Sequence, residues 1–326
     1  MSAVASSFRL NRDFFRRYGT PLGAVGIFIV FSILAPNFFS SRNLFLLLRQ
    51  MSMLTIIALG FSIVMSAGGF DMSVGNTTGL VSIVLALVLI PTNNFAVALL
   101  AALAVGVAVG SINGLLVAYV GLPDFIGTFA IGSVMYGIKM LITRGNPIFF
   151  DGAVPAIFPF IGQGYVGPIP FPVILMFFFV LVAIFLMKKT SLGRRIYAIG
   201  GNKTASLYAG INIRRHRMLT FVISGFCVAV ASVVLTSRLG SAQPLAGETF
   251  LLDTIAVVFL STTMFGEGEP NPLGAFVGAL IISMLNNGLT MLSVPYYFQF
   301  ITKGSVVIIS VVLSVSLGQT LRVKFG

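Results

Sequence analysis

Charged residues are scarce in this sequence: Asp, Glu, Lys and Arg make up only 9 % of its 326 residues. A soluble chain has roughly a quarter charged residues, which cover its surface. With 57 % hydrophobic residues and a mean hydropathy of +1.04, this chain has too few polar side chains to cover a soluble domain. The composition therefore excludes a soluble globular protein and indicates a membrane protein.

Cysteine and histidine are nearly absent, with Cys227 and His216 as the single examples. A disulfide within the chain and a zinc site built on cysteines both need more than one cysteine, so both are excluded. A single histidine in a basic loop and a single cysteine leave no catalytic constellation to assemble, which argues against an intramembrane enzyme. No G-x-x-x-x-G-K-[ST] phosphate loop occurs either. We therefore expect no metal, no cofactor and no ATPase site in this chain.

Acidic residues are also scarce: eight Asp and Glu stand against twenty Lys and Arg, with a net charge of +12 and a pI near 10.4. In a soluble protein this excess would suggest nucleic acid as a partner. Here most of the basic residues lie in the segments 1–19, 188–217 and 319–326. If the amino terminus is cytoplasmic, all three segments are, which is the positive-inside distribution. The lipid bilayer thus explains the charge without nucleic acid, and both termini are predicted to be cytoplasmic.

Hydrophobic runs long enough to cross a membrane follow one another along the chain. About 20 apolar residues span the hydrocarbon layer as a helix. The prediction is an all-α polytopic membrane protein with a single transmembrane domain, residues 20–318, between a cytoplasmic segment 1–19 and a cytoplasmic tail 319–326. An uncleaved first span is expected, because no small-residue cleavage site follows it. About ten spans are predicted, at 20–35, 43–66, 73–91, 94–119, 125–143, 171–187, 218–236, 251–265, 271–290 and 299–318.

Weak self-similarity relates the two halves of the sequence. Asn113–Gly114 and the later Gly-Ser-Val at 132–134 are echoed by Asn287–Gly288 and the Gly-Ser-Val at 304–306. Because five spans separate the copies, the second half would be inverted in the membrane. A 5+5 inverted repeat is typical of transporters whose path lies at the repeat interface. The short eighth span would then be a broken helix that lines the path, and Asp253 at its start is either a path residue or an interfacial helix cap.

The basic segment 188–217 is predicted to be the main cytoplasmic loop. Its charge alone would suit an anchor on anionic lipid. Its sequence also predicts a short helix from Ala205 to Ala209, with a chain break at Gly200–Gly201, a cap at Asn202 and a stop at Gly210. A short helix between glycines suits a groove on a partner protein.

Four stretches carry a family resemblance: SAGGFDMSVGNTTG (66–79), LGRRIYAIGGNKTASLYAGI (192–211), SRLGSAQPLAGETFLLDTIAVV (237–258) and LNNGL (285–289). They resemble the ribose-, xylose- and arabinose-type sugar permeases of bacterial ATP-binding-cassette importers, over nearly the whole chain after the first span. The resemblance implies a permease in the bacterial inner membrane that forms the path for a monosaccharide or polyol. It also implies a second permease subunit, the same or non-identical, two ATPase subunits that use ATP and Mg²⁺, and an extracytoplasmic binding protein.

Three groups of candidate site residues follow. Sugars are bound through their hydroxyls by amides and carboxylates, although helix–helix hydrogen bonding is the alternative for each amide and a cap on the third span is the alternative for Asp71. The extracytoplasmic segments 144–170 and 237–250 are expected to receive the binding protein through charges of both signs. The ATPase-coupling candidates are Gly200, Gly201, Asn202, Ala205, Ala209 and Gly210; the substrate-path candidates are Asp71, Asn113, Asp253, Asn286, Asn287 and Gln299; the docking candidates are Arg144, Asp151, Arg238 and Glu248.

The sequence departs from the family pattern after the eighth span. The family usually has Gly-Gly-Thr-Ser and then Gly-Gly-Lys-Gly-Arg, whereas here Ser261–Met264 is followed by Glu267 and Glu269. These glutamates either pair with arginines of the 188–217 loop or favour a non-identical permease partner. The alternative function is a stand-alone ion-coupled secondary transporter, because inverted repeats and an intramembrane carboxylate also suit ion coupling.

Overall fold

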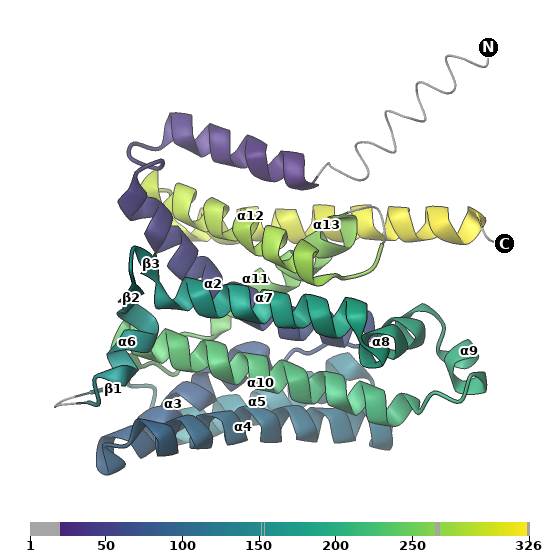
Figure 1. Ribbon diagram of the computed structural model, residues 1–326, viewed down its shortest axis with the longest axis horizontal. Coiled ribbons are helices and arrows are strands. Elements are labelled where there is room, and N and C mark those ends of the chain that lie inside the picture. The colour runs from purple at the N-terminus through teal and green to yellow at the C-terminus, as the bar shows by residue number, and fades with distance from the viewer. Residues whose placement is uncertain (1–19, 151, 153, 265–267, 325–326) are drawn as a thin grey trace. The chain divides into compact units, whose positions relative to one another are not determined.

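The computed structural model describes residues 20–150, 152, 154–264 and 268–324, and most of these residues are helical. The chain divides into two compact units, the first made of Met1–Leu47 with Leu252–Gly326 and the second of Leu48–Leu251. Figure 1 shows that helices make up both units. The prediction of an all-α polytopic membrane protein is thus confirmed in its coarse form.

The second unit holds most of the helices. Two helices cross the boundary between the units, namely α2 (Ser41–Ser66) and α11 (Glu248–Thr263). The first unit also contains a helix at Thr20–Leu34, α12 (Pro272–Met291) and α13 (Tyr296–Lys324). The second unit contains α3 (Val74–Thr92), α4 (Phe95–Leu115), the π-helix η1 (Leu116–Val120), α5 (Asp124–Thr143), α6 (Ile157–Gln163), α7 (Phe171–Lys189), α8 (Ser191–Gly201), α9 (Lys203–Tyr208) and α10 (Ile213–Leu239).

Within the described residues, seven helices are long and apolar enough to cross a membrane: α2, α3, α4 with η1, α5, α7, α10 and α12. Thr20–Leu34 and Tyr296–Val312 are shorter apolar helices. Each of the predicted segments coincides with one of these helices or with α11. The largest boundary difference is at α13, which continues to Lys324, six residues beyond the predicted end. Helix α10 begins five residues earlier than predicted, at Ile213, because the Asn212 side chain caps it, accepting from Arg215 N at 3.0 Å.

Four short strands were not predicted from the sequence. β1 (Ile148–Phe149) pairs antiparallel with β4 (Ser241–Ala242), with Ile148 opposite Ala242. β2 (Tyr165–Val166) pairs with β3 (Ile169–Pro170) in a separate hairpin. The first pair joins the segments 144–170 and 237–250, which are far apart in the sequence.

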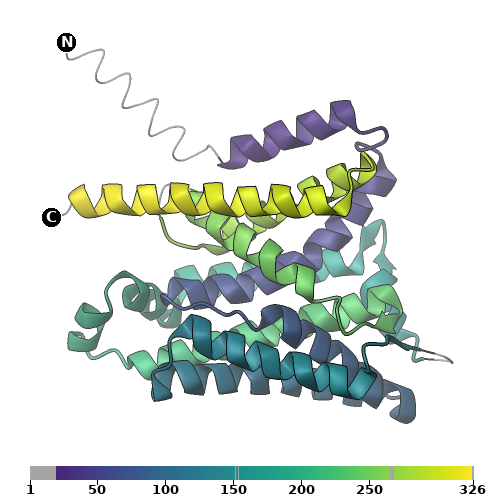
Figure 2. The same cartoon turned by 180° about the vertical axis from the view of Figure 1, so that it is seen from behind.

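Helices α4 and α10 lie side by side in the second unit (Figure 1), and α5, best seen from behind in Figure 2, packs against α3. Glycines at successive turns of α4 permit the α4–α10 approach. A Cβ built on Gly110 would overlap the carbonyl oxygen of Phe221, and one on Gly114 would lie 2.9 Å from the Cα of Met218. Small residues at a helix interface let backbones approach closely, which is how membrane helices gain packing energy without a hydrophobic driving force.

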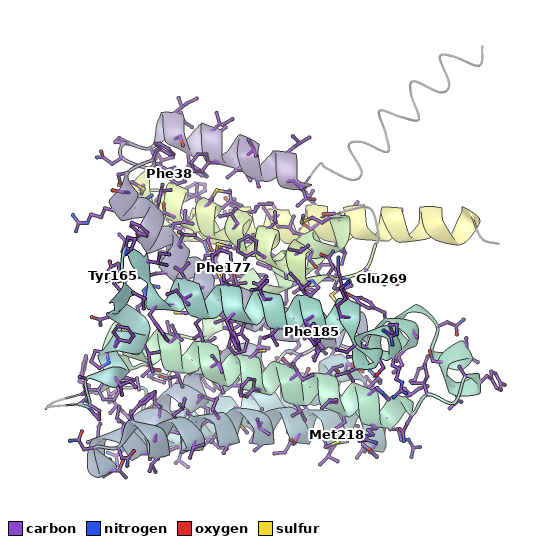
Figure 3. All side chains as sticks on the ribbon, in the orientation of Figure 1. Phe38, Tyr165, Phe177, Phe185, Met218 and Glu269 are labelled. Atoms are coloured by element: carbon purple, nitrogen blue, oxygen red, sulfur yellow. The ribbon has the colours of Figure 1, made fainter. Side chains whose placement is uncertain are left out.

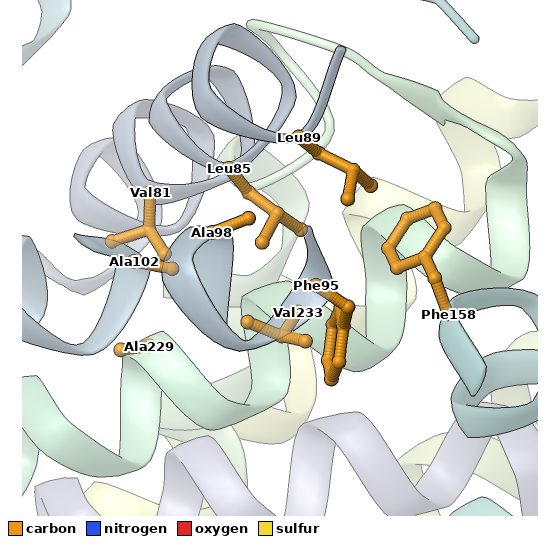
Figure 4. Close-up of a cluster of buried hydrophobic side chains, with 9 residues drawn as sticks. All are labelled: Val81, Leu85, Leu89, Phe95, Ala98, Ala102, Phe158, Ala229 and Val233. Carbon is orange, nitrogen blue, oxygen red and sulfur yellow. The ribbon is translucent and has the colours of Figure 1, made fainter. Parts of the chain in front are cut away.

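Each unit has its own apolar core. Figure 4 shows the cluster in which Val81, Leu85 and Leu89 of α3 meet residues of α4, α6 and α10. In the first unit, a separate cluster includes Phe31 and Phe38 with side chains of α12. Figure 3 labels Phe177 and Phe185 on α7, and both rings are exposed. Large apolar side chains exposed along a span are what lipid contact requires.

Candidate functional site

Asp71 is the centre of a buried polar cluster in the second unit. It lies in the segment 67–73, which joins α2 to α3. Its Oδ1 accepts from the Ser73 backbone N at 3.0 Å, from Ser73 Oγ at 2.6 Å and from Asn113 Nδ2 at 3.5 Å. Its Oδ2 accepts from Ser224 Oγ at 3.0 Å. The carboxylate therefore joins the start of α3 to α4 and α10.

The interpretation of Asp71 as the cap of α3 is correct only for one hydrogen bond, from the Ser73 backbone N to Asp71 Oδ1. Ser73 occupies the cap position, and its side chain makes no capping hydrogen bond. Asp71 lies two residues earlier and uses its oxygens on side chains of other helices as well as on Ser73. A sequence pattern cannot reveal those partners, because they come from distant parts of the chain.

Asn113 brings an acceptor to the Asp71 cluster. Its Nδ2 donates to Ser73 Oγ at 2.8 Å, whereas its Oδ1 is buried and accepts no hydrogen bond from any described residue. A buried polar atom without a partner costs about 1–3 kcal/mol. An amide oxygen beside a carboxylate can accept from the hydroxyls of a polar solute when the path opens. In this conformation both Asp71 and Asn113 are closed off from solvent.

The first unit contains a second polar cluster, around Asp253. Lys303 Nζ lies 2.8 Å from Asp253 Oδ1, and Asn286 Nδ2 donates to Asp253 Oδ2 at 3.1 Å. The interfacial-cap interpretation of Asp253 is wrong, because α11 begins at Glu248 and places Asp253 in its second turn. The cluster joins α11, α12 and α13. In the sequence, the feature that indicates it is a lysine, Lys303, within an apolar run.

The other two amide candidates make hydrogen bonds within the first unit. Asn287 and Asn43 exchange two hydrogen bonds, each 3.0 Å long, which tie α12 to the start of α2. Gln299 donates to the Val294 carbonyl oxygen at 3.3 Å and to Thr290 Oγ1 at 3.4 Å. For Asn287 the helix–helix alternative is thus what the structure contains.

Lys139, which the sequence analysis did not single out, is a buried cation of α5. Its Nζ donates to Asn76 Oδ1 of α3 at 2.9 Å and lies 3.6 Å from Glu248 Oε1. The Tyr136 ring lies 5.1 Å from the same ammonium, within cation–π range. The Lys139 side chain is 0 % exposed and that of Glu248 is 47 % exposed. A lone lysine in a predicted span was the signal that could have identified it, since a charge there needs a partner.

The ATPase-coupling candidates of the segment 188–217 lie on and beside the short helices α8 and α9. The Asn202 cap is confirmed, since its Oδ1 accepts from Ala205 N at 2.9 Å at the start of α9. Gly210, at φ +75°, follows α9 as predicted. The expected break at Gly200–Gly201 is wrong: both glycines belong to α8, and the helix changes direction at Asn202. Gly200 is used for close packing, because a Cβ there would overlap the Ser66 carbonyl oxygen.

The docking candidates Arg144, Arg238 and Glu248 have different surroundings in the structure. Arg144 is exposed and ends α5 at a left-handed φ of 52°. The Arg238 carbonyl oxygen accepts from Gln163 Nε2 at 3.2 Å, which ties the end of α10 to α6. Glu248 pairs with Lys139. Asp151 lies outside the described residues, as does Glu267.

No group of three or more His, Cys, Asp or Glu side chains that could hold a metal ion occurs in the described part of the chain. The two carboxylate clusters instead pair with amides, hydroxyls and one lysine. Amides and hydroxyls of this kind hydrogen-bond across membrane helices and hold them together.

Comparison with known proteins places this chain in a family. The model for the permease component of branched-chain amino acid transport systems matches residues 43–313. The chain is 36 % identical over 321 residues to the ribose import permease protein RbsC of Haemophilus influenzae, with 98 % of each chain covered. It is 39 % identical to the Bacillus subtilis protein of the same name, over 91 % of this chain and 92 % of that one. It is 36 % identical to the D-allose transport system permease protein AlsC of Escherichia coli, over 92 % of each. No solved structure matches the chain.

Proposed function

Since the chain belongs to the permease-component family of branched-chain amino acid-type transport systems, we propose that it forms the transmembrane path for a monosaccharide or polyol. The chain is a multi-pass membrane protein and the permease subunit of an ATP-binding-cassette importer, without an ATPase site of its own. The proposed solute class rests on the relatives whose names specify ribose and allose.

The proposed path residues are those of the two polar clusters. Asp71 with Asn113 and Asp253 with Asn286 each present a carboxylate beside an amide. Asp71, in the link that leads into α3, bonds to Asn113 of α4, and Asp253 of α11 bonds to Asn286 of α12. A lysine lies on the next helix in each case, Lys139 on α5 and Lys303 on α13. This correspondence supports a 5+5 inverted repeat of ten spans in one permease domain, residues 20–318, with the path at the repeat interface.

Family membership implies ATPase and binding-protein partners in general. The finer proposal is that both termini and the segment 188–217 are cytoplasmic, and that a second permease subunit, identical or not, completes the path. The binding protein would dock on the segments 144–170 and 237–250. Support for one joint docking surface comes from the β1–β4 pairing and from Gly162 N, which donates to Ser237 Oγ at 2.8 Å.

The ATPase-docking proposal rests on the surface of α9. Leu207 and Tyr208 are 61 % and 87 % exposed at the end of this short helix, while Ser206 between Ala205 and Leu207 is buried. An apolar pair presented on a capped helix, surrounded by basic residues, suits a groove on a partner protein. A plain lipid anchor needs the charges alone, not the cap and the helix.

A charge on α9 tests the docking proposal. Ala205→Glu should abolish the ATP hydrolysis that the permease stimulates in its partner ATPase, because the carboxylate enters the docking surface, while membrane insertion is retained. The readout is ATPase activity in proteoliposomes. Asn212→Asp is the matched control, since it adds the same charge to the same loop and keeps a side-chain acceptor for Arg215 N. Full stimulation by the Ala205→Glu variant would refute docking through α9.

A further inference from the structure

The segment 67–73 is a non-helical link whose backbone is held by glycines. It leaves α2 with Gly68 at φ +71° and with Gly69 N donating to the Val64 carbonyl oxygen at 3.0 Å. Left-handed φ after a helix favours glycine, as in the Schellman end. A Cβ on Gly69 would lie 2.9 Å from Asp124 Oδ2. Gly68 therefore permits the left-handed turn, and Gly69 permits the close approach by a carboxylate of α5.

Asp124 and Thr128 hold this link from α5. Phe70 N donates to Asp124 Oδ2 at 3.3 Å, and Met72 N donates to Thr128 Oγ1 at 2.9 Å. The backbone amides of two alternate residues of the link thus donate to side chains that lie one turn apart on α5. Since Asp71 lies between them, the position of its carboxylate depends on these two bonds.

Arg217 connects the same carboxylate to the cytoplasmic loop. It lies in the second turn of α10, directly after the segment that contains α9, and its Nη2 donates to both oxygens of Asp124 at 2.7 and 2.6 Å. Neither side chain is strongly exposed, with 12 % for Arg217 and 18 % for Asp124. A charge-assisted contact of this length is shorter and stronger than a neutral hydrogen bond.

The other end of the loop touches the same link directly. Gly200 of α8 packs on the backbone of Ser66 and Gly68, and a Cβ built on it would lie 3.4 Å from Gly68 N. The loop therefore contacts the link through α8 before α9 and through Arg217 and Asp124 after it. The same link is bonded to the Asp71 cluster. Asn113 donates to Ser73 Oγ and to Asp71 Oδ1, and Ser224 donates to Asp71 Oδ2.

We propose that Asp124 and Arg217 are positioning residues that transmit displacement of the 188–217 loop to the link 67–73 and so to α3 and the Asp71 cluster. The inference rests on the proposed docking of the ATPase at α9. In this proposal the Gly-Gly-x-Asp stretch, residues 68–71, is a flexible link between the helices that face the ATPase and the helices of the solute path. The ion pair acts through the link and does not itself contact solute.

Substitution of Asp124 tests this assignment in the assembled complex of permease, ATPase and binding protein. Asp124→Ala removes both the acceptor for Phe70 N and the partner of Arg217, so hydrogen exchange at Phe70 should rise about tenfold, equivalent to about 1.4 kcal/mol of lost local protection. Solute imported per ATP hydrolysed should fall, while the ATPase still co-purifies. Arg214→Ala removes an exposed guanidinium from the preceding turn of α10 and should leave exchange at Phe70 and Met72 unchanged.

Two more variants separate charge from hydrogen bonding. Asp124→Asn keeps an oxygen acceptor for Phe70 N but loses the charge that Arg217 pairs with, so exchange at Phe70 should change little while import per ATP still falls. Arg217→Ala leaves Asp124 in place as the acceptor for Phe70 N, so exchange at Phe70 should again change little while import per ATP falls. If both variants import solute at the wild-type ratio to ATP, the positioning role is overturned, even though docking at α9 stands.

A measurement on the unmodified chain covers the case in which Asp124→Ala does not fold. Addition of the ATPase to the wild-type permease should change hydrogen exchange at residues 67–73, with Ala205→Glu as the variant that prevents the change. ATPase association without any change at 67–73 would overturn the inference alone. Absence of association with the wild-type chain would instead overturn the proposed docking, so the two failures are distinguishable.

Discussion

Two lysines with carboxylate partners lie within apolar helices, and they differ in how far the partner is buried. Lys303 pairs with Asp253, whose side chain is 8 % exposed, whereas Lys139 pairs with Glu248, which is 47 % exposed. Removal of one member of a buried pair leaves an uncompensated charge and costs about 3–5 kcal/mol. An exposed partner contributes about 0–1 kcal/mol, because solvent screens it. The burial of the carboxylate should therefore decide how much stability is lost when it is neutralised.

Neutral isosteres test this difference residue by residue. Asp253→Asn should lower the apparent melting temperature in detergent much more than Glu248→Gln, because water can reach the Lys139 site through the half-exposed glutamate and because Asn76 still accepts from Lys139. Thermal unfolding of both variants beside the wild-type chain provides the comparison. An equal loss for the two variants would show that burial of the acid does not set the cost.

At the scale of elements, the α4–α10 interface depends on residues without side chains. A Cβ at Gly110 has no room beside Phe221, whereas Gly137 of α5 has no described atom within 4 Å of the position where a Cβ would be placed. Overpacking costs about 1–3 kcal/mol. Replacement of an unpacked helical glycine by alanine instead gains up to about 1 kcal/mol in helix propensity.

The two glycines therefore form a matched pair for substitution by alanine. Gly110→Ala should lower the apparent melting temperature, since α4 must move away from α10, and Gly137→Ala should leave it unchanged or raise it. Both substitutions add the same methyl group to a helix of the same unit, so the difference between the two melting temperatures reports the cost of packing at Gly110. A Gly110→Ala variant as stable as the wild-type chain would show that the α4–α10 interface can accommodate a methyl group at this position.

For the whole molecule, the decisive property is the energy source of transport. A permease subunit should import labelled ribose into proteoliposomes only with its ATPase, its binding protein and ATP present, because no phosphate-binding loop occurs in the chain. A sodium or proton gradient across vesicles of the purified chain should drive no uptake. Gradient-driven uptake by the chain alone would establish the alternative, an ion-coupled secondary transporter. Allose in place of ribose tests the breadth of the solute class.

The sequence by itself determined the features that depend on neighbouring residues. Hydropathy over a window of about 20 residues located the predicted spans, because backbone groups in lipid must be satisfied within one helix. The Asn202 cap and the stop at Gly210 were also readable, since a cap bonds to amides only a few residues away. The family resemblance, confirmed over residues 43–313, came from contiguous stretches as well.

Only the tertiary structure decided which distant side chains meet. The cap alternative for Asp71 involves only nearby backbone amides, yet Asn113 and Ser224 also reach it, from α4 and α10. Gly200 was expected to break the chain, yet it continues α8 because its missing side chain is needed for contact with Ser66. Such partners depend on how helices pack, and helix packing is set by the combined shape and small residues of several segments. No single segment of sequence contains that information, so these contacts emerge only in the folded chain.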